Sequence, residues 1–367
     1  MKSEQFANRI LRHETFSRST AVASFNHSPL GLVDVGARGD VDPVLTQLAE
    51  VSAVLAFEPD AEEAKRLQAK GNGIWASVVI EPSALADRDG EARLYLASEP
   101  NNHSLRRPNR LFTDRYAMEK FVEVGSEKLA TTTLDRILFE KYAERPWLGE
   151  ILKVDTQGTE LDVLKGAERT LQSRTAAIIC EVEFAPIYQD QPLFADVERW
   201  LRDRGFAFFG FSEQHGRSRK RLDKTSNGGR ERLLWSDAIF FKDPLATAQS
   251  AKGQERLADC LVVAATMLGF YDYALEVAEW SSAERPDGRA YYDVVKTLVE
   301  DLSRLDPESA RADVQKLADA VKAEPAKSNV LVGQFVDRRR KLHDYDDVRM
   351  ASPWSAAPQT LGWEPSR

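Results

Sequence analysis

The sequence is poor in cysteine and histidine. Of its 367 residues, only two are cysteine and five are histidine. Cys180 lies in the apolar run AAIICEVEF and Cys260 in LADCLVVAA, contexts in which cysteine behaves as a small core side chain. Two such residues make no disulfide framework, and no cysteine or histidine pair has zinc-ligand spacing. We therefore predict neither disulfides nor a metal site.

The sequence also lacks a long apolar stretch and an excess of positive charge. No apolar run reaches the roughly 18 residues of a membrane span, and the N-terminal MKSEQFANRILRHETF is too polar for a signal-peptide core. The net charge of −8 argues against wrapping nucleic acid. We expect a cytoplasmic globular protein with no nucleic-acid partner and no integral membrane segment.

Short apolar runs bounded by turn residues alternate with helical patterns along the first two thirds of the chain. Most of these runs are apolar on both faces, which is typical of a parallel sheet covered by helices. The last two are joined by a polar loop and should form an antiparallel hairpin at the sheet edge. The predicted strands are residues 31–37, 53–60, 75–81, 91–97, 150–158, 176–184, 206–211 and 235–243.

The character of the sequence changes after Asp243 and Pro244, where it becomes alanine-rich and helical with no strand signal. This change predicts a domain boundary. We assign residues 1–28 to an N-terminal helical extension and 29–245 to the main α/β domain. A helical C-terminal domain follows over 246–342, and the proline-containing residues 343–367 form an irregular tail.

The segment LVDVGARGDVDP, residues 32–43, combines a buried strand with a glycine turn. Asp34, Gly36 and Gly39 lie where the strand reaches the carboxyl edge of the sheet, and glycine there allows close approach to a ligand. The next strand ends in AFEPD, so Glu58 can accept hydrogen bonds from both hydroxyls of a ribose. Together the two strand ends predict an adenosine-containing cofactor.

The first loop distinguishes between two classes of cofactor. A dinucleotide needs a glycine-rich helix N-terminus for its pyrophosphate, usually G-x-G-x-x-G, and the sequence has only GARG. Asp34 would repel a pyrophosphate, but it suits the cationic amino group or sulfonium of S-adenosylmethionine. The electrostatics therefore favour S-adenosylmethionine over NAD.

The same residues resemble the FkbM-type family of class I S-adenosylmethionine-dependent methyltransferases over residues 31 to about 243. The matching segments occur in the order of that family and are DVGARGD, FEPD, SALADRDGEARLYL, TTTLDRIL, ILKVDTQGTELDVLKGA and EVEF. This resemblance implies a Rossmann-like, seven-stranded, mostly parallel sheet with an antiparallel edge strand. It also implies methyl transfer to oxygen, commonly on a sugar, glycolipid or secondary metabolite.

Site residues follow from the resemblance by position. It places Asp34, Gly36 and Gly39, with Ala37, around the methionine part of the cofactor. Glu58, with Pro59, would bind the ribose, and the stretch from Ser83 and Ala84 to Asp87 the adenine. Gln157 stands where many members of the family have glutamate.

Three residues are candidates for removing the acceptor proton. Asp155 follows the fourth parallel strand near the transferred methyl, Glu181 ends the fifth, and His103 lies in the loop NNHSL. Lys153 is expected to pair with one of the acids. The basic loop with Arg217, Arg219, Lys220 and Arg221 leaves the sheet at the same edge, so the acceptor could be acidic.

We therefore interpret the chain as an O-methyltransferase acting on a small-molecule or glycan acceptor. Two alternatives stay open: an NAD-dependent oxidoreductase, and a non-catalytic adaptor whose helical region binds a partner. Binding of NAD or of S-adenosylmethionine discriminates among them. The sequence predicts neither the acceptor nor the oligomeric state.

Overall fold

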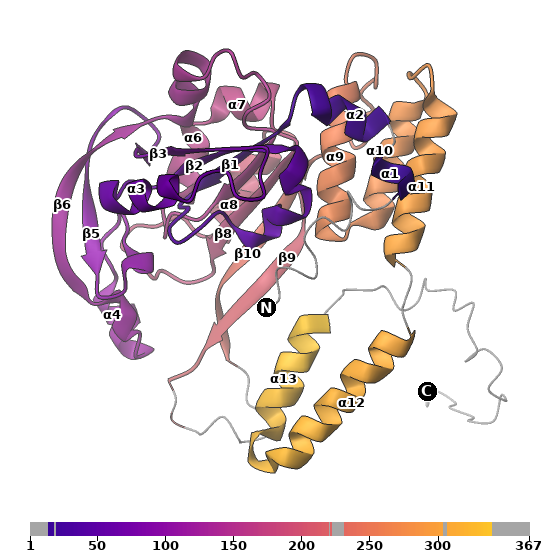
Figure 1. The fold of residues 1–367 in the computed structure, drawn as a ribbon. Coiled ribbons are helices and arrows are strands. Elements are labelled where there is room, and N and C mark those ends of the chain that lie inside the picture. Colours follow the sequence, from indigo (N-terminus) through magenta and orange to yellow (C-terminus); the bar gives the residue numbers. More distant parts are fainter. Residues whose placement is uncertain (1–13, 18–19, 220, 222–230, 304–306, 340–367) are drawn as a thin grey trace, which may run out of the picture. The chain divides into compact units, whose positions relative to one another are not determined.

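The computed structural model describes residues 14–17, 20–219, 221, 231–303 and 307–339 (Figure 1). These residues belong to two compact units, of which the first ends at Arg304 and contains both sheets. The second unit includes the helices α12 (Pro307–Ala323) and α13 (Ser328–Arg339) with the short turn η5 (Pro325–Lys327) between them.

Seven strands form the central sheet of the first unit, in the spatial order β3-β2-β1-β7-β8-β10-β9 (Figure 1). The five strands from β3 to β8 pair in parallel. Each of the seven overlaps a predicted strand, so the α/β fold class is confirmed. Their bounds are β1 (Leu30–Val35), β2 (Ser52–Phe57), β3 (Ser77–Glu81), β7 (Ile151–Val154), β8 (Ala177–Glu183), β9 (Phe206–Arg217) and β10 (Arg232–Lys242).

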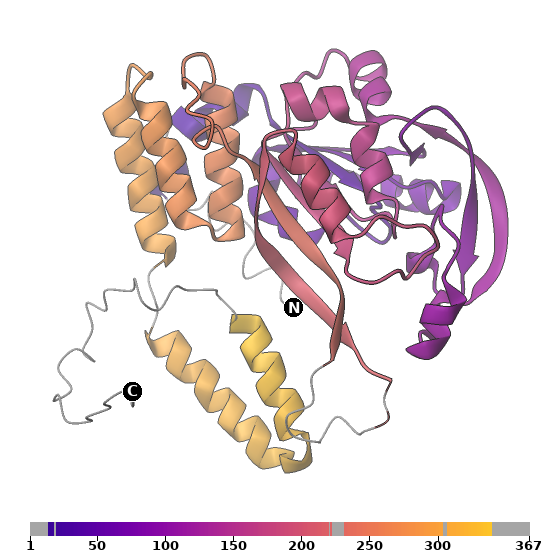
Figure 2. The same cartoon turned by 180° about the vertical axis from the view of Figure 1, so that it is seen from behind.

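The position of the reversed strand corrects the sequence analysis. The predicted hairpin forms, but its second arm, β10, is antiparallel to both β8 and β9, and β9 takes the sheet edge. Residues 238–241 of β10 are all buried, as suits an interior strand, whereas the phenylalanines at 208, 209 and 211 of β9 are only partly buried. Figure 2 shows the β9–β10 hairpin from behind.

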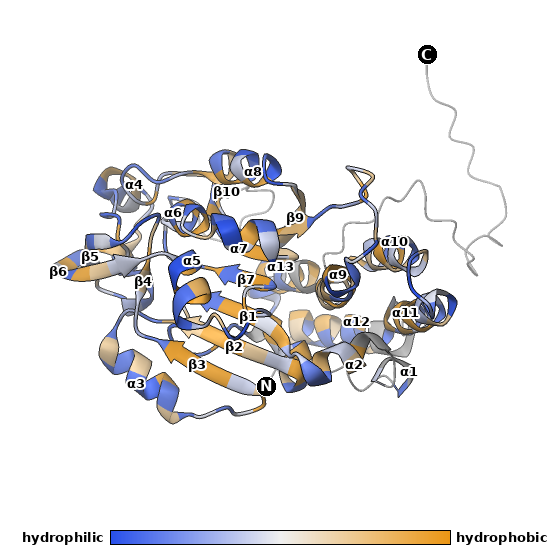
Figure 3. Ribbon diagram, turned by 90° about the horizontal axis from the view of Figure 1, so that it is seen from above, coloured by the Kyte–Doolittle hydropathy of each residue, from blue (hydrophilic) through white to orange (hydrophobic). Residues whose placement is uncertain are grey.

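Alternate residues of the buried strands enter two separate hydrophobic cores. On β1, Leu30 and Leu32 belong to one core, while Val33 and Val35 belong to the other. This alternation follows from the two-residue period of a strand that is covered on both faces. Figure 3 shows β1, β2 and β3 coloured as hydrophobic along most of their length.

Helices on each face complete these cores. The first core is shared with three consecutive helices, α9 (Glu255–Leu268), α10 (Tyr271–Ser282) and α11 (Gly288–Ser303). The second is shared with α5 (Leu134–Arg136), η4 (Ile137–Lys141), α6 (Glu160–Lys165), α7 (Glu168–Ser173) and α8 (Phe194–Arg202). The remaining helical segments of this unit are α1 (Glu14–Ser17), α2 (Thr20–His27), η1 (Pro43–Val51), α3 (Ala61–Ala69), η2 (Pro100–Asn102), α4 (Arg110–Arg115) and η3 (Glu119–Phe121).

An ion pair between Arg256 of α9 and Glu150 connects this helix to the amino edge of the sheet. Arg256 donates to both carboxylate oxygens of Glu150, at 2.6 and 2.7 Å. Glu150 also accepts a hydrogen bond from the backbone N–H of Gly31, at 2.9 Å. Because Gly31 is in β1 and Glu150 directly precedes β7, one carboxylate connects two strands and a helix.

The predicted domain boundary at 245/246 and the compact units do not coincide, because α9–α11 are in the same unit as the sheet. The domain assignment stays a prediction. Of the predicted N-terminal extension, the described part contains α1 and α2, and the predicted tail 343–367 lies outside the described residues. None of the described helices is both long enough and apolar enough to span a membrane.

A second, three-stranded sheet has the order β4-β6-β5, with bounds β4 (Ala84–Leu85), β5 (Gly90–Ala97) and β6 (Glu123–Thr132). The sequence analysis missed β4 and β6. β4 is only two residues long, and β6 is largely exposed and polar, so neither has an apolar run. Between β5 and β6, the side chains of Phe112, Tyr116, Met118 and Phe121 join a third, small core.

Candidate active site

The carboxyl ends of β1, β2 and β7 surround two adjoining cavities. The smaller has a volume of about 90 Å³, and the larger about 250 Å³. The two share five lining residues, Gly36, Arg38, Asn101, Asp155 and Gln157. The shared residues make this region a junction, where groups bound in the two cavities would meet.

Gly36 is required by the packing of two strand ends. Its φ is +92°, and a Cβ at this position would lie 1.9 Å from the carbonyl oxygen of Asp155. The N–H groups of Gly36 and Ala37 both donate to the carbonyl of Phe57, at 3.1 Å. The glycine therefore lets β1 turn tightly against the ends of β7 and β2, and it also lines both cavities.

The smaller cavity brings together residues that the sequence predicted around a nucleoside. Glu58, Pro59, Ser83 and Ala84 all line it. Glu58 is buried and accepts a hydrogen bond from the N–H of Asp60, at 2.9 Å. Burial raises the pKa of Glu58. The apolar part of the wall is formed by Val35, Phe57, Leu85, Leu94 and Leu105.

Four other residues of the predicted cofactor site line neither cavity. Asp34 is buried and accepts a hydrogen bond from the N–H of Asp42, at 2.9 Å. Ala37 lines a separate groove. Gly39 donates its N–H to Glu63, and Asp87 is exposed. Their predicted roles in binding the cofactor stay predictions.

Arg38 is a cation of the junction that the sequence analysis did not select. Its guanidinium lies 3.6 Å from a carboxylate oxygen of Glu58 and 3.2 Å from one of Asp60. It lies within the predicted glycine turn, between Gly36 and Gly39, and this position is the only signal that pointed to it.

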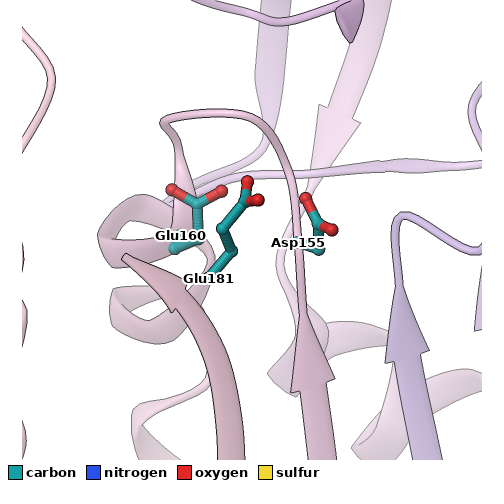
Figure 4. Close-up of side chains that lie close together, drawn as sticks. All are labelled: Asp155, Glu160 and Glu181. Atoms are coloured by element: carbon teal, nitrogen blue, oxygen red, sulfur yellow. The ribbon is translucent and has the colours of Figure 1, made fainter. Parts of the chain in front are cut away.

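Three carboxylates cluster around the junction. Asp155, Glu160 and Glu181 have oxygens within 4.8 Å of one another (Figure 4). Burial, followed by the charges of Asp155 and Glu183, raises the pKa of Glu181 well above its usual value. An acidic cluster by itself does not identify a metal site, so the absence of a metal stays a prediction.

Glu160 stabilises the loop after β7. Its carboxylate accepts hydrogen bonds from the N–H groups of Thr156 and Gly158, at 2.8 and 3.0 Å. Burial raises its pKa to about 7. These contacts fix the loop that leads into α6.

Lys153 is buried among carboxylates, as the sequence predicted. Its Nζ lies 3.0 Å from Asp237, 3.7 Å from Asp155 and 3.8 Å from Asp42. Burial opposes the charged form, but Asp155, Asp237 and Asp42 raise the pKa of Lys153 well above its usual value. Lys153 therefore places a positive charge next to the carboxylate of Asp155.

His103 lies apart from the other two candidate bases. It lines only the smaller cavity, and its Nδ1 accepts a hydrogen bond from the N–H of Ala97, at 3.1 Å. Burial and the neighbouring Arg38 lower its pKa. With Nδ1 occupied as an acceptor, the neutral ring carries its proton on Nε2.

The larger cavity is lined by both apolar and polar side chains. Phe121, Ile187, Tyr188 and Trp235 contribute rings and methyl groups, and Glu181 and Glu183 contribute carboxylates. Tyr188 and Phe121 come from segments that the sequence analysis left unassigned. Among the described residues of the basic loop, Arg217, Arg219 and Arg221 line neither cavity, and Lys220 lies outside the described residues.

Replacement of Asp34 by asparagine is expected to stabilise the protein at alkaline pH. Burial raises the pKa of Asp34 from 3.8 to about 7. The folded state therefore retains a proton that the unfolded chain has lost, so the free energy of unfolding falls as the pH rises from 3.8 to about 7. An asparagine at this position keeps an acceptor for the N–H of Asp42 without a buried charge.

Thermal unfolding from pH 4 to 8 measures this effect. The melting temperature of Asp34→Asn should exceed that of the wild type by a margin that grows up to about pH 7. Each kcal/mol of added unfolding free energy corresponds to roughly 2 to 4 °C. Asp87→Asn, at an exposed position, is the control and should leave the curve unchanged. A margin independent of pH would contradict the assigned ionisation.

Comparisons with known proteins agree with the sequence analysis. Residues 34–208 match the family model described as Methyltransferase FkbM domain. No curated protein matches the chain. Among solved structures, the chain is similar to methyltransferase FkbM from Methylobacillus flagellatus KT, with 13% identity and a TM-score of 0.31. This match covers 58% of the present chain and 43% of the length of that one.

A second similar structure is magnesium protoporphyrin IX methyltransferase (ChlM) from Synechocystis PCC 6803. With bound SAM, it shows 10% identity and a TM-score of 0.29, and the match covers 61% of the present chain and 74% of that one. With bound SAH, the same protein shows 10% identity and a TM-score of 0.28, and the match covers 60% of the present chain and 78% of that one.

Proposed function

We propose that the protein transfers the methyl group of S-adenosylmethionine to a hydroxyl oxygen of a small-molecule or glycan acceptor, because residues 34–208 match the family model described as Methyltransferase FkbM domain. Methyl transfer is the activity of the family, and the oxygen acceptor is our inference. The observation that carries the proposal is the junction of two cavities at the carboxyl edge of the sheet.

The smaller cavity is the proposed binding site for the nucleoside part of the cofactor. Glu58 would accept hydrogen bonds from the ribose hydroxyls, and the apolar wall with Ser83 and Ala84 would contact the adenine. When bound, S-adenosylmethionine supplies an electrophilic methyl group on a positively charged sulfur. Asp155 at the junction places negative charge on the methyl-transfer side of the cavity.

The larger cavity is the proposed acceptor site. A lining that combines aromatic and aliphatic groups with carboxylates and amides suits a ring that has an apolar face and several hydroxyls, such as a sugar. Arg38 is the cation of this lining, and it already faces Glu58 and Asp60. We therefore favour a neutral acceptor over the acidic one that the basic loop suggested.

The chain contributes mainly orientation and proton removal. The acceptor oxygen forms a bond to the methyl carbon as the carbon–sulfur bond breaks, and its proton must leave. Holding the reacting atoms in line lowers the activation free energy by roughly 7 to 11 kcal/mol. A general base raises the rate by about 10²- to 10⁴-fold. Asp155 and Glu181, the two candidates that line the larger cavity, are the preferred proton acceptors.

Glu58→Gln is expected to weaken S-adenosylmethionine binding by roughly 10- to 100-fold. A hydrogen bond to a charged group contributes about 1.5 to 3 kcal/mol, and 1.4 kcal/mol corresponds to a factor of ten. Isothermal titration calorimetry measures the change. Glu62→Gln, on the exposed face of α3, is the matched control and should bind like the wild type.

The same calorimeter distinguishes the oxidoreductase alternative. The N–H of Val44 at the start of η1 donates to the side chain of Asp42, at 2.8 Å, so a carboxylate occupies the position that a dinucleotide pyrophosphate needs. The wild type should bind S-adenosylmethionine and S-adenosylhomocysteine but not NAD. Binding of NAD alone would overturn the proposal, and binding of none of the three would favour the adaptor.

A further inference from the structure

Among the described residues that line the junction, Gln157 contacts both candidate carboxylates. Its Nε2 donates to Oδ1 of Asp155 and to Oε2 of Glu181, each at 2.8 Å. A primary amide has two N–H groups, and here each has one carboxylate acceptor. The amide therefore bridges the end of β7 and the end of β8.

A hydrogen bond from Tyr188 to the oxygen of this amide fixes its orientation. The hydroxyl of Tyr188 donates to Oε1 of Gln157, at 2.9 Å, and the tyrosine is almost completely buried. Reversal of the amide would turn an oxygen toward two carboxylates and an N–H₂ group toward a hydroxyl donor. The tyrosine thus directs the two N–H groups of Gln157 toward the acids.

The backbone supports the same arrangement. Gln157 has φ +59°, a left-handed conformation that is uncommon for residues other than glycine, asparagine and aspartate. Its carbonyl accepts a hydrogen bond from the hydroxyl of Ser104, at 2.6 Å. The next residue, Gly158, allows the ring of Tyr188 to approach, because a Cβ there would lie 2.8 Å from that ring.

On these contacts, and on the function proposed above, we propose that Gln157 is a positioning residue that holds Asp155 and Glu181 side by side at the junction and favours the deprotonated form of the pair. In that state the pair can accept the proton of the acceptor hydroxyl. A residue at 157 that cannot donate to both acids leaves two neighbouring carboxylates to share a proton.

Other ionisable groups around the pair enter the same titration. Lys153 lies 3.7 Å from Oδ2 of Asp155, so that carboxylate faces a cation on one side and the amide on the other. Burial and nearby carboxylates raise the pKa of Glu183 and of Glu181. The charged or titratable groups that face the pair from the neighbouring elements are Lys153, Glu160, Glu183, Tyr188, Asp237, Asp34, Asp42 and Arg38.

The test measures the protonation of the pair directly, in the full-length protein without ligand. Carboxyl carbon shifts of protein labelled with ¹³C in aspartate and glutamate side chains are followed from pH 4 to 9. Asp155→Asn and Glu181→Gln assign the two signals by their disappearance. Gln157→Glu should move the titration of the pair upward by at least about one pH unit, because a third carboxylate replaces a donor.

Two further variants keep the test decisive. Gln189→Glu introduces the same charge at an exposed position nearby and should not move the titration. Tyr188→Phe releases the amide without changing residue 157 and should produce a smaller upward shift. It decides the outcome if Gln157→Glu does not fold. An unchanged titration of the pair in a folded Gln157→Glu or Tyr188→Phe variant would overturn the inference.

Failure of the inference is distinguishable from failure of the proposed function. Calorimetric binding of S-adenosylmethionine to the wild type tests the function without any variant at position 157. A wild type that binds the cofactor, together with an unshifted pair in the variants, would reject only the role of Gln157. A wild type that does not bind it would reject the function.

Discussion

Gly36→Ala is expected to lower the free energy of unfolding by about 2 to 5 kcal/mol and to abolish cofactor binding. The left-handed conformation, with φ +92°, costs an alanine about 1 to 2 kcal/mol. Its methyl group would also lie 1.9 Å from the carbonyl oxygen of Asp155, and relief of such a clash typically costs about 1 to 3 kcal/mol. The clash is with backbone, so the ends of β1 and β7 must separate.

Gly39→Ala is the matched control for this variant. Gly39 has almost the same φ, +93°, but a Cβ there would have no neighbour within 4 Å. Only the conformational cost applies, so about 1 to 2 kcal/mol is expected. Urea denaturation followed by circular dichroism measures both values. If the two variants lost the same free energy of unfolding, contact between the strand ends would not be the reason for glycine at position 36.

Removal of helices α9–α11 is expected to prevent folding of the sheet. Side chains of one sheet face pack with these helices in a single core, which includes Leu30, Leu32, Val54, Ile151, Ile179, Ile239 and Phe241. Burial of one large apolar side chain contributes roughly 1.5 to 3 kcal/mol, whereas a whole protein is stable by only about 5 to 15 kcal/mol. A chain ending at residue 245 should therefore be insoluble or molten.

A chain ending at residue 304 is the appropriate comparison. It retains all three helices and the contact of Arg256 with Glu150, and it ends where the first compact unit ends. It should be soluble and unfold cooperatively, as judged by size-exclusion chromatography and thermal melting. A folded 245-residue chain would show that α9–α11 form an independent appendage after all.

The buried parallel strands were predictable because their signal is local. The strands around Val33, Leu55, Leu152 and Ile179 are short apolar runs between turn residues, and burial on both faces leaves them few polar positions. Glu58 was placed at a ligand site for a related reason, since carboxyl ends of parallel strands meet at one edge, whereas Ser83 was predicted only through the family resemblance. Strand order at the hairpin was not predictable, because either arm could have paired with β8.

The direction of side chains at the strand ends could not be predicted in the same way. Asp34 was expected to face a ligand, but its carboxylate accepts from the N–H of Asp42 inside its own loop. Such contacts depend on the turn conformation, which the sequence constrains only through Gly36. The bridge made by Gln157 depends on Tyr188, 31 residues further on, and no sequence pattern connects the two.

The segment between β5 and β6 packs into the small third core, together with Ala185, Ile187, Tyr188 and Leu234, and not into the two cores that hold the sheet. It nevertheless supplies Asn101, Asn102 and Phe121 to the wall of the larger cavity. Mutations there can remodel that wall while both large cores keep all their members. In evolution, relatives of this protein could therefore diverge in the compounds they modify while inheriting an unaltered scaffold.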